Sequence, residues 1–237
     1  MYAVVAVARI CYILHGLVNK FYNFSGGKFM KIYTIPVGML QTNCYFVVNE
    51  ELKEAVIFDP GGDPDKLLLA AEKLEVKVVA ICLTHGHSDH IGGLAEVRKE
   101  TGAPVYIGEA DADCLLNPSS NLSFFVGHEV QNEPADFLVH DGDVLTLGGM
   151  KFECFATPGH TPGGICYYNA ENEVVFAGDT IFCESIGRTD LPGGSYKALL
   201  QSIKTKLLTL PDDVHLLPGH GPSTSVAWEK RRNPFLQ

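Results

Sequence analysis

The chain has 237 residues and a net charge of −10, with 18 Lys and Arg residues against 28 Asp and Glu residues. Its length suits one large domain or two small ones, and a core can form without disulfide bonds. The acidic balance and the scarcity of basic clusters argue against a nucleic acid as partner, because phosphate binding requires Lys and Arg. We interpret Lys230-Arg231-Arg232 as the last turn of a helix, where cations are favourable.

The seven cysteines are widely spaced, and none belongs to a C-x-x-C motif. Several lie inside apolar runs, so we expect buried, reduced thiols and not a disulfide scaffold. This pattern favours a cytoplasmic protein.

Residues 1–29 differ in composition from the chain that follows them. The first 18 residues are apolar but are interrupted by Arg9 and His15, are short for a membrane span, and lack the basic start and cleavage site of a signal peptide. Met30 then begins a regular strand pattern. We expect residues 1–29 to lie outside the fold, as an upstream start-site artefact or alternatively a membrane-proximal leader. Residues 30–237 are expected to form one domain without stable membrane association.

The first half of the chain alternates predicted strands and helices. A helix capped by Asp63 or Asp65 is expected after the turn at residues 59–64. β-Branched and aromatic residues predict strands at 31–36, 44–48, 55–58, 77–83 and 105–107, with further helices at 94–100 and 109–116.

Residues 117–136 have weak periodicity, which predicts a long loop near a site or a lid. We expect its Phe124-Phe125-Val126 run to pack on the body of the protein, with contact to substrate as the alternative. Two halves that each pair a sheet with helices predict an α+β fold, an αββα four-layer sandwich. The second half contributes expected strands at 144–147, 151–156, 165–168, 173–177 and 215–217, and helices at 196–210 and 223–232.

Potential metal ligands are densest in the stretch Thr84-His85-Gly86-His87-Ser88-Asp89-His90, directly after the strand at residues 77–83. Ligands bind at the C-terminal ends of strands in α/β proteins, and imidazole and carboxylate groups suit borderline metals. The alternative is a His-rich surface turn.

Three later segments run from an apolar strand into a turn with a glycine, and they display His160, Asp179 and His220. Each glycine lets the backbone turn sharply beside a ligand. A lone histidine is more often a surface or packed residue, but four such loops in one chain favour a shared metal site.

On these residues the chain resembles the metallo-β-lactamase-fold hydrolases. His85-x-His87-x-Asp89-His90 matches the H-x-H-x-D-H motif of that family, and the three later residues match its single ligands. The resemblance covers about residue 30 to the C-terminus. It is strongest to the glyoxalase II group, the hydroxyacylglutathione hydrolases, and specifically to its short bacterial branch. The stretches at 157–163 and 187–194 support this subgroup.

The resemblance implies two divalent metal ions, zinc first, with iron or manganese as alternatives. Two ions about 3.5–4 Å apart can share a hydroxide. The alternative role for Asp89 is to orient a metal-binding histidine and not to bind a metal itself. The implied ligands are His85, His87 and His160 for the first ion, Asp89, His90 and His220 for the second, and Asp179 as the bridge.

The implied reaction is hydrolysis of a small-molecule thioester such as S-lactoylglutathione by a metal-bound hydroxide, with Asp89 and Asp179 as catalytic residues. Arg188 is the candidate contact for substrate carboxylates, and a salt bridge to Asp190 or Glu184 is its alternative role. Because the chain ends soon after His220, we expect it to lack the helical domain that holds glutathione in full-length relatives. This leaves room for other thioesters or esters, including lactones.

Three other functions share parts of this sequence pattern. A persulfide dioxygenase on this fold uses a single iron held by two His and one Asp, and the Gly-Arg-Thr-Asp stretch is similar to that group. Hydrolysis of β-lactams is disfavoured, because Asp179 stands where true lactamases carry a Cys. A non-enzymatic metal-binding module is disfavoured because the ligand set leaves metal positions open. We expect the remaining histidines, His15, His128, His140 and His215, to be structural or exposed.

Overall fold

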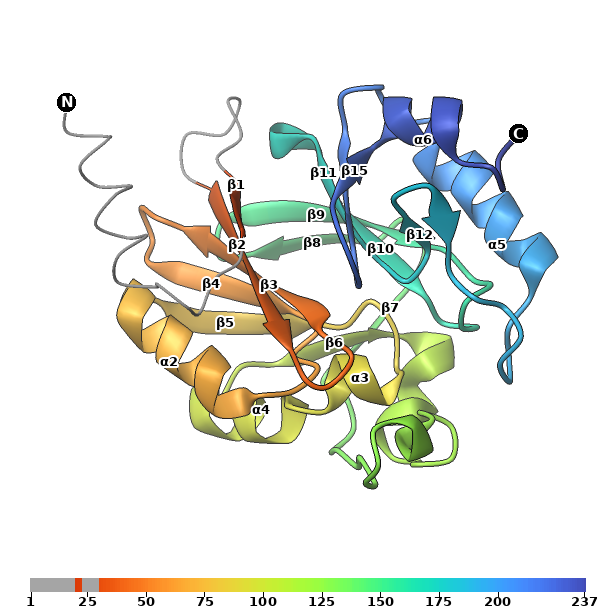
Figure 1. The fold of residues 1–237 in the computed structure, drawn as a ribbon. Coiled ribbons are helices and arrows are strands. Elements are labelled where there is room, and N and C mark those ends of the chain that lie inside the picture. The colour runs from red at the N-terminus through yellow and green to blue at the C-terminus, as the bar shows by residue number, and fades with distance from the viewer. Residues whose placement is uncertain (1–19, 23–29) are drawn as a thin grey trace.

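Two β-sheets face each other in the computed structural model, and helices cover the outer face of each sheet (Figure 1). The structure describes residues 20–22 and 30–237. The predicted αββα sandwich is confirmed. Its layers enclose three apolar clusters: one between each sheet and its helices, and one between the two sheets.

The first sheet is antiparallel from β1 to β4 and parallel from β4 to β7. Parallel strands present their C-terminal ends at one edge, so the loops after β4, β5 and β6 lie together there. The strands are β1 (Lys20–Tyr22), β2 (Met30–Val37), β3 (Thr42–Asn49), β4 (Glu54–Phe58), β5 (Lys77–Cys82), β6 (Val105–Gly108) and β7 (Phe137–Val139).

The second sheet has the order β15-β14-β11-β10-β9-β8, and a separate hairpin joins β12 to β13. β11 and β14 are parallel and pair Gly178 with Pro218, so the loops that follow these two strands start side by side. The strands are β8 (Val144–Leu147), β9 (Met150–Ala156), β10 (Ile165–Asn169), β11 (Val174–Gly178), β12 (Ile181–Phe182), β13 (Ser185–Ile186), β14 (His215–Pro218) and β15 (Thr224–Ser225).

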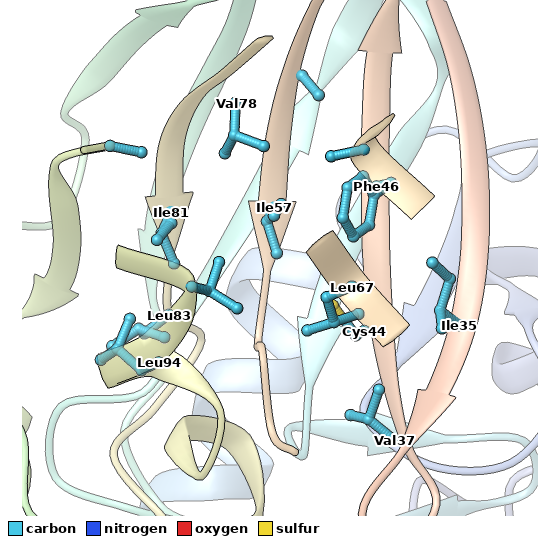
Figure 2. Close-up of a cluster of buried hydrophobic side chains, with 14 of the residues drawn as sticks. Ile35, Val37, Cys44, Phe46, Ile57, Leu67, Val78, Ile81, Leu83 and Leu94 are labelled. Carbon is cyan, nitrogen blue, oxygen red and sulfur yellow. The ribbon is translucent and has the colours of Figure 1, made fainter. Parts of the chain in front are cut away.

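Helices α2 and α4 cover the first sheet, and α5 and α6 cover the second (Figure 1). Figure 2 shows strand side chains such as Phe46 and Ile57 beside Leu67 of α2, while Ile81 and Leu83 lie near Leu94 of α4. The helices are α2 (Pro64–Leu74), α3 (Ser88–Ile91), α4 (Leu94–Thr101), α5 (Tyr196–Ser202) and α6 (Val226–Arg232), with shorter turns η1 (Glu109–Leu115), η2 (Ser123–Phe125), η3 (Ala170–Asn172) and η4 (Ile203–Leu207).

Several local predictions need correction. Asp63 occupies the N-cap position of α2 but makes no side-chain capping bond, because its Oδ2 accepts a hydrogen bond from the backbone N–H of Gly38 at 3.0 Å. The helix expected at residues 196–210 is α-helical only to Ser202 and continues as the π-helical η4. The basic cluster does form the last turn of a helix, α6, as predicted.

Other predictions fall at the edge of the described chain or outside it. β1 belongs to residues 1–29, which we expected to lie outside the fold, and it pairs with β2. The domain boundary at residue 30 remains a prediction. Cys11 and His15 lie outside the described residues. The six described cysteines are all free thiols, and no described helix has the length and apolar character needed to span a bilayer.

Candidate metal centre

The loop after β5 carries the densest group of histidines, as predicted. His85 and His87 precede α3, and Asp89 and His90 lie within that short helix, so one turn displays all four side chains. Gly86 is required here, because a Cβ at this position would lie 2.3 Å from Cβ of Cys114. The loop therefore passes tightly over η1.

Three imidazoles meet on one side of the centre. Nδ1 of His87 lies 3.1 Å from Nε2 of His85 and 2.9 Å from Nε2 of His160. His160 comes from the turn after β9, so residues 73 positions apart in the chain supply one group of nitrogen donors. All three side chains are buried.

A second group forms from Asp89, His90 and His220. Nε2 of His220 lies 3.1 Å from Oδ2 of Asp89, and Nε2 of His90 lies 3.6 Å from the same oxygen. The Asp179 carboxylate lies between the two groups, with Oδ1 3.4 Å from Nε2 of His90 and Oδ2 3.6 Å from Nε2 of His160. The fold thus brings all seven predicted ligand residues into one cluster.

Hydrogen bonds fix which nitrogen of each imidazole faces the cluster. Nδ1 of His160 donates to the carbonyl oxygen of Arg188 at 2.8 Å, and Nδ1 of His220 donates to that of Leu40 at 3.2 Å. Carbonyls only accept, so the Nδ1 atoms of these two rings carry hydrogen and their Nε2 atoms face the cluster. His87 instead turns Nδ1 inward.

Lone pairs aimed at one another repel unless a cation lies between them. Nε2 of His90 and Oδ1 of Asp179 are buried and have no hydrogen-bond partner, although buried polar atoms are normally paired. Imidazole nitrogens with carboxylate oxygens form a donor set that suits zinc, iron or manganese. The residues present therefore fit a divalent metal centre.

The protonation states of His85, His87 and Asp179 agree with this fit, whereas at His90 and His220 the neighbouring carboxylates outweigh burial and raise the imidazole pKa values. Burial lowers the pKa of His85, and it lowers that of His87 to about 3, so both rings are neutral near pH 7. Burial alone would raise the pKa of Asp179, but the imidazoles around it outweigh that effect and hold the pKa below its ordinary value. Neutral imidazoles and ionised carboxylates are the forms that bind metals.

Asp59 supports the centre and was missed by the sequence reasoning. Its buried carboxylate accepts hydrogen bonds from the backbone N–H and the hydroxyl of Thr84, both at 2.7 Å, and lies 3.0 Å from Nδ1 of His90. The Thr84 hydroxyl lies in turn 3.1 Å from Nδ1 of His85. Asp59 thus orients one imidazole in each ligand group. In the sequence, its position at the end of β4 within a turn cluster was the signal that could have identified it.

Asp59→Asn is expected to lower metal affinity and turnover by about 10–100-fold, the usual cost of losing a group that orients a metal ligand. The amide keeps the size of the side chain but cannot accept from all three donors. Metal content by elemental analysis, with turnover on the same samples, checks this. Asp212→Asn is the matched control, because Asp212 is exposed and pairs with Lys230. Equal metal content and turnover in Asp59→Asn and wild type would contradict the role given to Asp59.

Asp111 is a second residue that the sequence reasoning did not identify. It is fully buried and accepts hydrogen bonds from the backbone N–H groups of Gly86 at 3.0 Å and Gly163 at 2.6 Å. These two glycines belong to the loops that carry His87 and His160. Asp111 therefore holds two ligand loops, one from each sheet, in fixed relation.

Two glycines confirm the predicted need for close backbone approach. Gly178 has a φ of 49°, in the left-handed region, and a Cβ there would lie 2.2 Å from Oγ1 of Thr84. A Cβ on Gly219 would lie 2.2 Å from Oδ1 of Asp179. A side chain at either position would displace the centre.

A cavity of about 290 Å³ opens onto the cluster, with His87, Asp89, His160, Asp179 and His220 in its wall. Its remaining lining residues are Leu40, Ser88, Leu122, Phe125, Arg188 and Leu191. The loop at residues 117–136 lies beside the site, as predicted. The expected packing of Phe124-Phe125-Val126 on the body holds for Val126, which packs against the apolar cluster under α2. Phe124 and Phe125 are 68% and 46% exposed, and Phe125 lines the cavity.

Arg188 lies at the site, but its guanidinium is already engaged. Nε donates to Oδ1 of Asp190 at 2.8 Å, and an NH2 group donates to Oδ2 at 2.9 Å. Glu184, the other candidate partner, accepts from Nε1 of Trp228 instead. Of the remaining histidines, His140 and His215 are exposed, and His128 lines a neighbouring cavity.

Residues 37–220 match the model of the metallo-beta-lactamase superfamily. The chain belongs to this superfamily. The family and the ligand cluster together identify a metal-dependent hydrolase.

Two relatives extend this result. The chain is 43% identical over 208 residues to the probable metallo-hydrolase YqgX of Bacillus subtilis, covering 87% of this chain and 98% of the relative. It is 39% identical over 210 residues to the hydroxyacylglutathione hydrolase GloC of Haemophilus influenzae, with the same two coverages of 87% and 98%.

Three solved structures share the fold. The B3 metallo-beta-lactamase BLEG-1 has a TM-score of 0.84 at 42% identity, over 87% of this chain and 99% of that one. The di-iron-bound form of TTHA1623 has a TM-score of 0.77 at 37% identity, over 86% and 99%. ETHE1 from Myxococcus xanthus has a TM-score of 0.72 at 30% identity, over 86% and 83%.

Proposed function

We propose that the protein hydrolyses thioesters of the S-lactoylglutathione type. The observation that carries this proposal is the 39% identity to GloC, which extends over 98% of that relative. The cavity at the ligand cluster supports it, because a carbonyl placed there would reach both groups of ligands.

In this proposal, His85, His87 and His160 would hold one divalent ion, and Asp89, His90 and His220 would hold a second, with Asp179 contributing to both. Zinc is the first choice, and the di-iron form of TTHA1623 makes iron the second. Bound ions of this kind lower the pKa of water to about 7 and polarise a carbonyl oxygen. The protein's own side chains supply the other contributions to catalysis.

Asp89 and Asp179 are the groups placed to act on the attacking water. Both line the cavity, and Thr42 donates from Oγ1 to Oδ2 of Asp89 at 3.2 Å, which fixes that carboxylate. A carboxylate that accepts a hydrogen bond from water turns a lone pair of the water oxygen toward the acyl carbon. The new C–O bond forms and the C–S bond breaks, giving a carboxylic acid and a thiol. A thiol has a pKa of about 8.5, so it leaves as the thiolate without a strong protein acid.

The alternative is an iron-dependent persulfide dioxygenase, with which the likeness to ETHE1 is compatible. A single assay series separates the two. With metal-loaded protein and S-lactoylglutathione, we expect thiol release that stops on chelation, returns on readdition of metal, and consumes no oxygen. Oxygen uptake with sulfite formation from a persulfide, in the absence of thiol release, would overturn the proposal. A β-lactam added to this assay series tests for β-lactam hydrolysis, the activity in the name of BLEG-1.

A further inference from the structure

Glu229 of α6 carries a fully buried carboxylate outside the ligand cluster. Its oxygens accept the backbone N–H of Glu184 at 3.2 and 3.1 Å and the side-chain amide of Asn233 at 2.7 Å. The hydroxyl of Thr224 also donates to this carboxylate. A buried carboxylate is costly unless hydrogen bonds compensate it, so these donors are tied firmly to α6.

The bond to Glu184 falls on a strained turn. Glu184 is the second residue of the two-residue turn between β12 and β13, in which Phe182 pairs with Ser185. Its φ is 57°, in the left-handed region, where such turns normally carry glycine or asparagine because other side chains are strained there. Asn233 adds a bond from Nδ2 to the carbonyl oxygen of Ser185 at 2.9 Å. The turn lacks the residue type that favours it locally, so contacts from α6 hold it in place.

The same hairpin connects two parts of the ligand cluster. β12 begins two residues after Asp179, and β13 ends two residues before Arg188, whose carbonyl oxygen accepts from Nδ1 of His160 at 2.8 Å. Gly187 packs so closely on Asp179 that a Cβ at Gly187 would lie 1.9 Å from the backbone oxygen of Asp179. A shift of the hairpin would therefore move Asp179 together with the carbonyl that orients His160.

We propose that Glu229 is a positioning residue for the metal centre. It holds the β12–β13 turn in its left-handed conformation, and the hairpin in turn fixes Asp179 and the carbonyl group of Arg188. Glu229 acts through the backbone of the hairpin and does not itself bind metal or substrate. This inference concerns how the chain places its metal ligands, so it does not rest on the proposed thioester hydrolysis.

The first test measures the Zn²⁺ affinity of metal-depleted protein by competition with a chromophoric chelator. Glu229→Gln keeps the size of the side chain but places an NH2 group where a carboxylate oxygen accepts hydrogen bonds. We expect this variant to bind Zn²⁺ about tenfold more weakly, the lower end of the cost of losing a group that orients a metal ligand. Glu72→Gln is the matched control, because it makes the same substitution at an exposed position of a helix, and it should bind Zn²⁺ as wild type does.

The second test examines the route through the turn. Glycine adopts a positive φ without strain, so Glu184→Gly lets the turn form without help from α6. Added to Glu229→Gln, it should return the Zn²⁺ affinity to within about threefold of wild type, because the strain of a left-handed non-glycine residue is removed. A general loss of packing around α6 would not be repaired by a substitution at the tip of the hairpin, so this rescue distinguishes positioning from stability alone.

Two outcomes would overturn the inference. One is a lower thermal unfolding midpoint in Glu229→Gln with unchanged Zn²⁺ affinity of the folded protein, because Glu229 would then only stabilise the fold. The other is a loss of affinity that Glu184→Gly does not restore, because the effect would not pass through the turn.

If Glu229→Gln does not fold, Asn233→Ala takes its place, since it removes the bond to Ser185. We expect weaker Zn²⁺ binding in that variant, and wild-type affinity would contradict the inference. Absence of thioester hydrolysis in the wild-type protein would refute the proposed function but leave these affinities, and the inference drawn from them, unaffected.

Discussion

Asp179→Ala is expected to reduce bound metal from two ions per chain to fewer than one, and to lower kcat for thioester hydrolysis by about 1,000-fold, the scale seen when a group that stabilises charge in the transition state is lost. Asp179 is the one residue of the cluster placed between both ligand groups, 3.4 Å from Nε2 of His90 and 3.6 Å from Nε2 of His160. In the proposed two-metal centre its negative charge would offset the repulsion between the two cations, so we expect neither ion to remain tightly held without it.

Elemental analysis and thiol release on the same preparation measure both quantities for Asp179→Ala. The matched control is Asp212→Ala, since Asp212 is exposed and pairs only with a surface lysine. A thermal unfolding midpoint close to that of wild type in metal-free buffer shows that the variant is folded. If Asp179→Ala keeps two ions and most of its turnover, Asp179 does not lie between the metals.

His220→Ala is expected to leave one ion per chain and to lower turnover by at least about 100-fold, because loss of even a group that orients a metal ligand costs up to about 100-fold. Nε2 of His220 lies 3.1 Å from Oδ2 of Asp89 in the second group and 3.7 Å from Oδ2 of Asp179 between the groups. The first group of imidazoles does not involve it. Removing His220 should therefore empty one position selectively.

This variant also separates the two candidate functions. A mononuclear iron enzyme would hold one ion with or without His220, and its oxygen uptake would change little. His140→Ala is the control, because His140 is an exposed histidine outside the cluster. Equal metal content in wild type and His220→Ala would argue against a two-metal centre.

The ligand loops could be predicted because each displays its side chain directly after an apolar strand. His85 and Asp179 follow β5 and β11, and His160 and His220 follow β9 and β14 within a few residues. Strand ends are visible as apolar runs, and glycines mark the turns. The sequence pattern therefore carries most of the information needed to place the cluster.

The supporting residues could not be predicted, because their roles depend on contacts between distant segments. Asp59 acts on His90 across 31 residues, and Asp111 joins Gly86 to Gly163 across a span of 77. In the sequence, Asp59 belongs to a turn and Asp111 to a short helix. Neither lies in a motif, and only the folded arrangement shows that each carboxylate accepts several hydrogen bonds.

Short and exposed elements were also beyond prediction. β7 was missed because Phe137 and Leu138 are about half exposed and do not alternate, and β12, β13 and β15 have only two residues each. For Arg188, the sequence left substrate contact and a salt bridge open. The choice depends on a local backbone geometry that brings Asp190 onto the guanidinium.

The most direct test of the central claim is a titration of metal-depleted protein with Zn²⁺ while thiol release from S-lactoylglutathione is followed. We predict that activity rises until two equivalents are bound and then stays constant, and that His220→Ala reaches its low plateau at one equivalent. Full activity at one equivalent, or activity that requires iron and oxygen, would contradict a two-metal thioester hydrolase.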